Sequence, residues 1–154
     1  IRISRAGLHN IERKLISDEN DKKIKRLAKK FDRVLVDAPC TGTGTWRRDP
    51  DTRAKYSDLD LVNMMSLQDR ILASAARLTK PGGCLVYVTC SLLQEENEDR
   101  ITALLSRRKD YKVLPIPKIW ENWTTRIAWA QLATLIAERC YVFGSSLRKI
   151  TAVK

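Results

Sequence analysis

Histidine is nearly absent from this chain, and its cysteines lack the spacing of a metal site. The 154 residues contain one histidine, His9, and four cysteines, none of which forms a C-x-x-C pair. We therefore expect no zinc site and no bound metal. A hydrolase of the Ser–His or Cys–His kind is also poorly supported, because its nucleophile needs an imidazole partner.

Long apolar runs and targeting segments are missing too. No run approaches the roughly 20 residues of a membrane span, and no signal peptide is visible. We expect a cytoplasmic protein whose cysteines remain free thiols. The first residue is Ile1 rather than Met, so we expect the chain not to be a complete translation product. Its length is enough for one domain with its own core.

Acidic residues are too few to balance the basic ones. The chain has 29 Lys and Arg against 18 Asp and Glu, a net charge of +11. Such an excess favours a polyanionic partner, most commonly nucleic acid. The alternative is a solvated basic surface without a partner.

The segment TWRRDPDTRAKY, residues 45–56, concentrates this basic character around an aromatic side chain. Trp46 is followed by Arg47, Arg48, Arg53 and Lys55. Basic residues interleaved with aromatics suit phosphates and unstacked bases, and Arg47, Arg48 and Lys55 are our candidates for contacts with RNA. An ordinary solvated loop has the same composition, so the segment alone does not decide between the two interpretations.

Two short apolar runs predict buried strands of a parallel sheet. DRVLVDAP, residues 32–39, and CLVYVTC, residues 84–90, contain consecutive apolar residues, as strands covered on both faces do. Between them, apolar residues at helical spacing predict a helix from Asp58 to Thr79, and KPGG, residues 80–83, ends it. The residues of this apolar stripe are Leu61, Met64, Ile71, Leu72, Ala75 and Leu78.

The flanking segments predict further elements. Ser91 and Gln94 fit a capping box, which predicts a helix that opens at Ser91 with an acidic first turn. YKVLPI, residues 111–116, predicts a weaker third strand, and NIERKLIS, residues 10–17, a short one. The alternation of strand and helix predicts right-handed crossovers and a doubly wound, mostly parallel sheet of the α/β class.

Two thiols and a carboxylate fall at the carboxyl ends of the two main strands. Asp37 and Cys40 follow the first strand, and Cys90 ends the second. If the two strands are neighbours, they lie about 4.8 Å apart, and both thiols can then face one pocket. A thiolate is a strong nucleophile, and a helix that begins directly after Cys90 is expected to lower the pKa of its thiol. The alternative is an inert core cysteine, which we expect of Cys84.

The other polar features of this edge are less specific. A carboxylate at the position of Asp37 either caps nearby amides or contacts a ligand. The TGTG run that follows Cys40 resembles a phosphate loop only loosely, because it lacks G-x-x-x-x-G-K-[ST].

The two cysteine-bearing segments together resemble a known enzyme family. DRVLVDAPCTGTGTWRRDPD, followed about thirty residues later by PGGCLVYVTCSLLQEENED, resembles the Nop/Sun family of RNA cytosine-C5 methyltransferases, and the bacterial members that modify ribosomal RNA look closest. The resemblance covers residues 4–115 and implies a Rossmann-like fold with S-adenosylmethionine as methyl donor. It implies RNA as substrate, ribosomal in preference to transfer RNA.

The resemblance also implies roles for individual residues. Cys90 in TCS would be the nucleophile that adds to C6 of the cytosine, and Cys40 in DAPC would help to resolve the adduct. Asp37 would lie near both cofactor and base, with Pro39 beside the cofactor. Asp18 would match the family's acidic position at the adenine end of the cofactor.

The chain departs from the family pattern at both ends. The glycine-rich cofactor loop, of the D-x-C-A-x-P-G-G-K-T kind, is absent, so we expect the fold to be incomplete on its N-terminal side. The usual D-G-F-F-x-A-x-L ending is absent as well. We therefore interpret residues 1–118 as the carboxyl part of a catalytic domain and residues 119–154 as a divergent tail. The competing hypothesis is a non-catalytic remnant that binds RNA through its basic surface.

Overall fold

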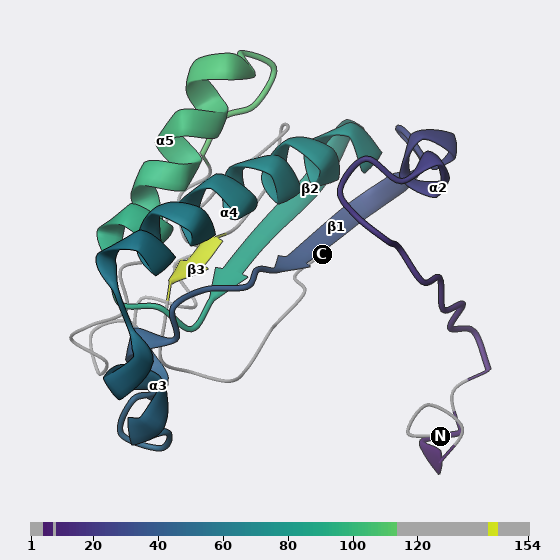
Figure 1. Ribbon diagram of the computed structural model, residues 1–154. Helices are drawn as coiled ribbons and strands as arrows, with labels where there is room; N and C mark the ends of the chain where they lie inside the picture. Colours follow the sequence, from purple (N-terminus) through teal and green to yellow (C-terminus); the bar gives the residue numbers. More distant parts are fainter. Residues whose placement is uncertain (1–4, 8, 114–141, 145–154) are drawn as a thin grey trace, which may run out of the picture.

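The described part of the chain is an α/β unit built on a parallel sheet (Figure 1). The computed structural model describes residues 5–7, 9–113 and 142–144. Its sheet has the strand order β1 (Phe31–Asp37), β2 (Thr79–Thr89) and β3 (Val142–Gly144), and both neighbouring pairs are parallel. The helical elements are α2 (Lys22–Arg26), η1 (Thr43–Thr45), α3 (Pro50–Lys55), α4 (Asp58–Leu78), η2 (Gln94–Glu96) and α5 (Glu98–Arg107). This arrangement confirms the predicted α/β, Rossmann-like class.

The unit β1–α4–β2 confirms the strand–helix–strand order read from the sequence. α4 begins with a reciprocal capping box, in which Asp60 N donates to Ser57 Oγ at 3.2 Å and Ser57 N donates to Asp60 Oδ2 at 3.1 Å. The helix ends at Leu78, one residue before its predicted end. β2 begins at Thr79, so the KPGG segment lies inside the strand instead of preceding it as predicted. No helix in the described residues is long and apolar enough to cross a membrane.

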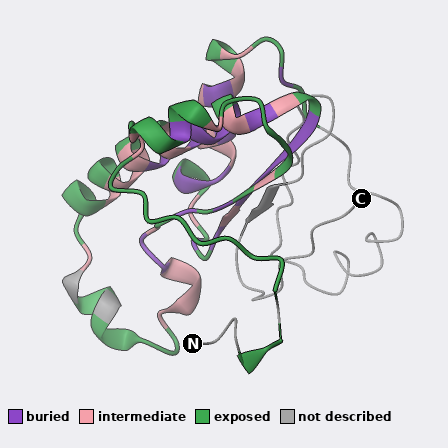
Figure 2. Cartoon of the chain, turned by 90° about the vertical axis from the view of Figure 1, so that its right-hand side faces the viewer, coloured by how far each residue is buried: buried purple, intermediate pink, exposed green. Residues whose placement is uncertain are grey.

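Buried residues of α4, α5 and the two long strands form the core, in which α4 packs on the sheet and α5 packs against α4 (Figure 2). Val36 on β1 is paired in register with Tyr87 on β2, so both side chains lie on the same face. Tyr87 and Leu72 of α4 are almost completely buried. Cys84 is also part of this cluster, as predicted for a core cysteine. On the opposite face of β1, Leu35 is 44% exposed.

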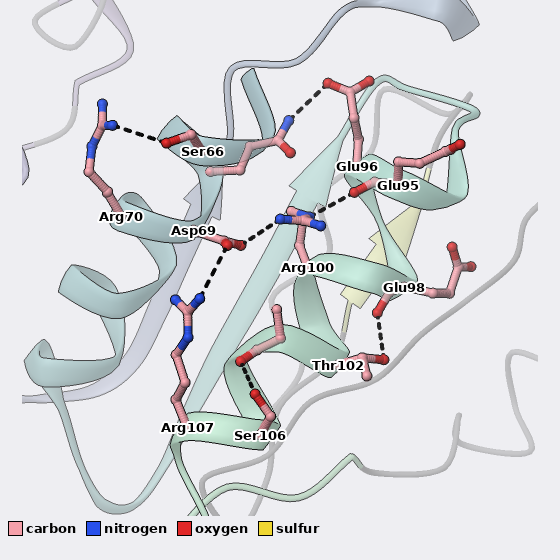
Figure 3. Close-up of polar contacts among 12 residues, drawn as sticks. Ser66, Asp69, Arg70, Glu95, Glu96, Glu98, Arg100, Thr102, Ser106 and Arg107 are labelled. Carbon is pink, nitrogen blue, oxygen red and sulfur yellow. Dashed lines mark hydrogen bonds and ion pairs between the residues drawn. The ribbon is translucent and has the colours of Figure 1, made fainter. Parts of the chain in front are cut away.

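An ion-pair network joins the two long helices (Figure 3). Asp69 of α4 accepts a hydrogen bond from Arg100 Nη1 of α5 at 3.0 Å, and Arg107 approaches its other oxygen at 3.9 Å. Arg100 also donates to the carbonyl of Glu95 at 2.7 Å. This network fixes the start of α5 and the preceding segment against α4.

Three predicted elements need correction or fall partly outside the description. The segment 10–17 is not a strand, and Asp18 follows it in a turn before α2. The helix predicted to open at Ser91 begins at Glu98 instead. Only residues 111–113 of the predicted strand 111–116 are described, and the third strand of the sheet is β3. Cys140 and most of the predicted tail 119–154 lie outside the described residues.

Candidate active site

The sulfur atoms of Cys40 and Cys90 face one another at the carboxyl edge of the sheet. Their Sγ atoms are 3.1 Å apart, and the backbone N–H of Cys90 donates to Cys40 Sγ at 3.3 Å. Cys40 is half-buried, whereas Cys90 is exposed. The expectation that both thiols share one site is confirmed.

The register of the sheet brings the sulfur atoms of Cys40 and Cys90 together. Asp37, the last residue of β1, lies opposite Val88 of β2. The pairing continues beyond the strand, because Ala38 N donates to Val88 O at 2.9 Å. Cys40 and Cys90 therefore emerge within a few residues of the same paired position, and the parallel sheet delivers both thiols to one edge.

The TGTG loop lies directly against the backbone of Cys90. Gly44 N donates to Cys90 O at 2.9 Å, and Leu92 N donates to Thr43 Oγ1 at 2.7 Å. A Cβ atom on Gly44 would lie 2.6 Å from Cys90 O, so only glycine allows this approach. The Gly44 amide is thus occupied by the protein's own backbone, which argues against the loose resemblance to a phosphate loop.

The segment after Cys90 is held by side chains instead of opening a helix. Thr89 Oγ1 donates to Asn97 Oδ1 at 2.7 Å, and Asn97 Nδ2 donates to Leu93 O at 2.7 Å. Ser91 Oγ accepts from Leu93 N at 3.1 Å, a local turn that replaces the predicted capping box. Since α5 begins only at Glu98, the predicted activation of Cys90 by an adjoining helix dipole is wrong.

The environments of the two thiols are different. Burial, and next the hydrogen bond with Cys90, raise the pKa of the Cys40 thiol from 9.0 to about 12. Cys40 is therefore a neutral thiol at physiological pH and can donate its S–H. Cys90, the exposed member of the pair, is the sulfur that a substrate can reach.

Two buried polar residues beside the thiols were missed as site residues. Gln68 and Glu96 are both fully buried, and they hydrogen-bond to each other at 3.0 Å. Gln68 falls on the apolar stripe of α4, and a polar residue within such a stripe was the available signal. Glu96 was assigned to the acidic first turn of a helix, but it lies in η2.

The predicted cofactor residues lie at separate places. Asp37 is exposed at the end of β1, and Pro39 follows it in the loop to Cys40. Asp18 is exposed, and one of its carboxylate oxygens accepts from Asn20 N at 2.7 Å. In the described residues, no group of three or more His, Cys, Asp or Glu side chains is placed to hold a metal ion.

The residues predicted to contact RNA lie in the segment that follows the TGTG loop in the chain. Arg47 and Arg48 are exposed just after η1, and the side chain of Lys55 in α3 lies outside the described residues. Trp46 packs within the protein, edge-to-face with Tyr56 at 5.5 Å between ring centroids and with Arg53 6.0 Å above its ring. The aromatic residue thus stiffens a basic segment.

Comparison with known families decides where this site belongs. Residues 2–135 match the family described as 16S rRNA methyltransferase RsmB/F. The chain belongs to this family. Ribosomal RNA small subunit methyltransferase B of Klebsiella pneumoniae is 50% identical over 80 residues, which are 52% of this chain and 19% of that protein. The protein of the same name from Shewanella oneidensis is 46% identical over 83 residues, 54% of this chain and 19% of that protein.

Two solved structures are also similar to this chain. The crystal structure of PH0851 matches with a TM-score of 0.70 and 35% identity, over 75% of this chain and 26% of that one. A methyltransferase homologue from Pyrococcus horikoshii matches with a TM-score of 0.61 and 38% identity, over 74% of this chain and 33% of that one. The matched region spans about a fifth of the length of the curated relatives, whose names are those of RNA methyltransferases.

Proposed function

We propose that this chain carries the two catalytic cysteines of an S-adenosylmethionine-dependent RNA cytosine-C5 methyltransferase that acts on ribosomal RNA. The observation that carries the proposal is the Cys40–Cys90 pair, with its sulfur atoms 3.1 Å apart at the carboxyl edge of a parallel sheet. Family membership supports the reaction class, and the names of the relatives support the RNA. Residues 1–118 would belong to the catalytic domain.

Cys90 is proposed as the nucleophile, because it is the exposed member of the pair. Its thiolate would add to C6 of the target cytosine, which breaks the aromaticity of the ring and gives C5 the character of an enamine carbon. S-adenosylmethionine, when bound, supplies an electrophilic methyl group on a sulfonium centre. The base must be unstacked to reach the thiol, as RNA-modifying enzymes require.

Cys40 is proposed to assist the release of Cys90. After methylation, the proton on C5 passes to water, the C5–C6 double bond re-forms, and the bond from C6 to Cys90 Sγ breaks with its electron pair on the sulfur. A neutral Cys40 thiol at 3.1 Å can donate its S–H to the departing sulfur and stabilise the thiolate. The raised pKa of Cys40 suits this role, because its thiol remains protonated and available as a hydrogen-bond donor.

The residues present fit a cofactor with amino and hydroxyl donors. Asp18 and Asp37 offer exposed carboxylates as acceptors, and we propose that Asp18 takes the adenine end. Asp37, followed by Pro39, ends β1 beside the thiol loop, where its carboxylate can also hydrogen-bond the edge of the cytosine. Arg47, Arg48 and Lys55 are proposed to hold the RNA backbone near the flipped base.

The experiment that tests the proposal compares substitution of the exposed site cysteine, Cys90, with substitution of the core cysteine, Cys84. Methyl transfer to ribosomal RNA would be measured with the longest protein that the gene encodes, as wild type, Cys90→Ala and Cys84→Ala. Loss of transfer in Cys90→Ala alone is the expected result, because Cys84 lies in the core. If Cys90→Ala retained transfer, the assignment would be wrong. If the wild type bound RNA and S-adenosylmethionine but transferred no methyl, the non-catalytic RNA-binding remnant would be the better account.

A further inference from the structure

Cys40 is held by hydrogen bonds on both sides along the chain. On one side, Gln68 Nε2 of α4 donates to Pro39 O at 2.9 Å. On the other side, Thr41 N donates to Glu96 Oε1 at 2.9 Å, and Thr41 Oγ1 donates to Glu96 Oε2 at 2.5 Å. The residues immediately before and after Cys40 are therefore both fixed, although Cys40 lies in a loop.

The two holding side chains are joined to each other. Gln68 Nε2 donates to Glu96 Oε1 at 3.0 Å, so the amide bridges Pro39 and the Glu96 carboxyl group. Glu96 is itself anchored, because Tyr87 Oη donates to its backbone carbonyl at 2.9 Å. Tyr87 belongs to β2, the strand that leads to Cys90. One connected network therefore ties the Cys40 loop to the segment that carries Cys90.

Burial of the polar side chains of Gln68 and Glu96 costs free energy, and filling the core does not by itself require polar residues at these positions. Gln68 and Glu96 are 0% exposed, and burial of a carboxyl group costs free energy unless its oxygens are satisfied. Both oxygens of Glu96 accept hydrogen bonds, and two of the donors belong to Thr41. An apolar pair at these positions could fill the core, but it could not hold the loop.

We infer that Gln68 and Glu96 are positioning residues that hold the thiol of Cys40 at hydrogen-bonding distance from the thiol of Cys90. The chemical meaning of this inference rests on the proposed function, in which Cys40 acts after Cys90 has added to the base. Loss of the clamp would leave Cys90 able to form the adduct but would move Cys40 away from the departing sulfur. The clamp would thus control release of the RNA rather than its capture.

The first test measures thiol proximity and needs no RNA. The chain would be treated with diamide, which accepts two hydrogens and two electrons as Cys40 and Cys90 form a disulfide, and the linked peptides would be quantified by mass spectrometry. Glu96→Ala is expected to slow formation of the Cys40–Cys90 disulfide by about tenfold or more. This factor corresponds to the free energy of one lost hydrogen bond to a charged group. Tyr111→Phe is the matched control, because it removes one buried hydrogen bond, to Ala76 O near the end of α4, and leaves Gln68, Glu96 and the Cys40 loop unchanged.

Two further variants keep the test decisive if Glu96→Ala does not fold. Thr41→Val preserves size and removes only the hydroxyl donor to Glu96 Oε2, so it is expected to slow the disulfide less than Glu96→Ala does but more than the control. Glu96→Gln keeps the Oε1 acceptor, and this variant is expected to form the Cys40–Cys90 disulfide at a near wild-type rate. If Thr41→Val and the control formed the disulfide equally fast, the clamp would not set the distance between the thiols.

The second test separates positioning from simple loss of stability. With the longest protein of the gene, S-adenosylmethionine and ribosomal RNA, the ratio of denaturant-resistant protein–RNA adduct to methylated product would be measured. A lower folded fraction reduces both quantities equally, whereas a displaced Cys40 raises their ratio, as expected for Thr41→Val and Glu96→Ala.

Cys40→Ala is the reference that keeps the two proposals distinguishable. If Cys40→Ala gives no adduct, the proposed cysteine roles fail and the diamide test alone judges the clamp. If Cys40→Ala gives adduct but the clamp variants match Tyr111→Phe, the positioning role is overturned.

Discussion

Cys40 and Cys90 place their sulfur atoms 3.1 Å apart, although 50 positions separate them in the chain. The parallel pairing of β1 and β2 produces this proximity, and the loop hydrogen bonds refine it. One thiol is half-buried and the other is exposed. This asymmetry gives the two cysteines different chemistry, and it can be measured on the chain by itself.

The pH dependence of Cys40 alkylation should reveal its buried position. Because its folded pKa is about 12, modification by iodoacetamide should rise continuously from neutral pH to about pH 10 without a plateau. The folded state holds this proton more tightly than the unfolded chain does. Its contribution to stability is therefore complete below pH 9.0 and is lost as the pH rises towards 12. Peptide mass spectrometry would follow the rate, and a plateau below pH 9.0 would show that Cys40 is not buried as described.

Substitution of Gly44 by alanine should disturb the Cys90 segment. The added Cβ would lie 2.6 Å from Cys90 O, and it would force apart the Gly44–Cys90 hydrogen bond of 2.9 Å. We expect the free energy of unfolding to fall by about 1–3 kcal/mol and the Cys40–Cys90 disulfide to form more slowly. Urea denaturation and the diamide assay would measure both effects. An unchanged disulfide rate would mean that the TGTG loop does not position Cys90.

The ion pair between α4 and α5 should stabilise the fold measurably. Asp69 and Arg100 have side chains only 19% and 15% exposed, so Asp69→Asn should lower the free energy of unfolding by about 2 kcal/mol. Asp32→Asn is the matched control, because the Asp32–Lys80 pair is largely exposed. No measurable loss is expected for Asp32→Asn in urea denaturation. Equal losses in both variants would argue that burial of the Asp69 pair has no energetic consequence.

RNA binding should depend on the segment that follows the TGTG loop. Arg47→Ala combined with Arg48→Ala should weaken binding of single-stranded RNA and reduce the slope of log K against log salt by about 1.4, or about 0.7 per lost phosphate contact. Lys22→Ala combined with Lys25→Ala removes the same charge from the exposed surface of α2 and serves as the control. Fluorescence anisotropy over a salt series would compare the two. Identical slopes would indicate a diffuse basic surface without a defined RNA contact.

The strands and the long helix could be predicted because their signals are local. Consecutive apolar residues marked β1 and β2, and helical spacing marked α4 to within one residue of its end. The meeting of Cys40 and Cys90 also followed, because the carboxyl ends of neighbouring parallel strands share one edge. These inferences needed only periodicity and topology.

The wrong or missed predictions concern residues whose side chains form hydrogen bonds that the local sequence pattern does not reveal. Ser91 had the sequence of a helix cap, but its hydroxyl serves a local turn while Asn97 holds the surrounding backbone. The segment 10–17 had strand composition but forms no strand among the described residues. Gln68 was missed because its importance comes from Pro39 and Glu96, which lie 29 and 28 positions away in the sequence.

Covalent trapping of RNA would show whether Cys90 is the nucleophile and Cys40 the release residue. Cys40→Ala in the longest protein of the gene would be incubated with S-adenosylmethionine and cellular RNA, and the products would be separated under denaturing conditions. We expect a stable protein–RNA band that disappears when Cys90→Ala is added to the same protein, and sequencing of the trapped RNA would identify the target. Normal turnover by Cys40→Ala, with no adduct, would contradict the assignment of nucleophile and release residue.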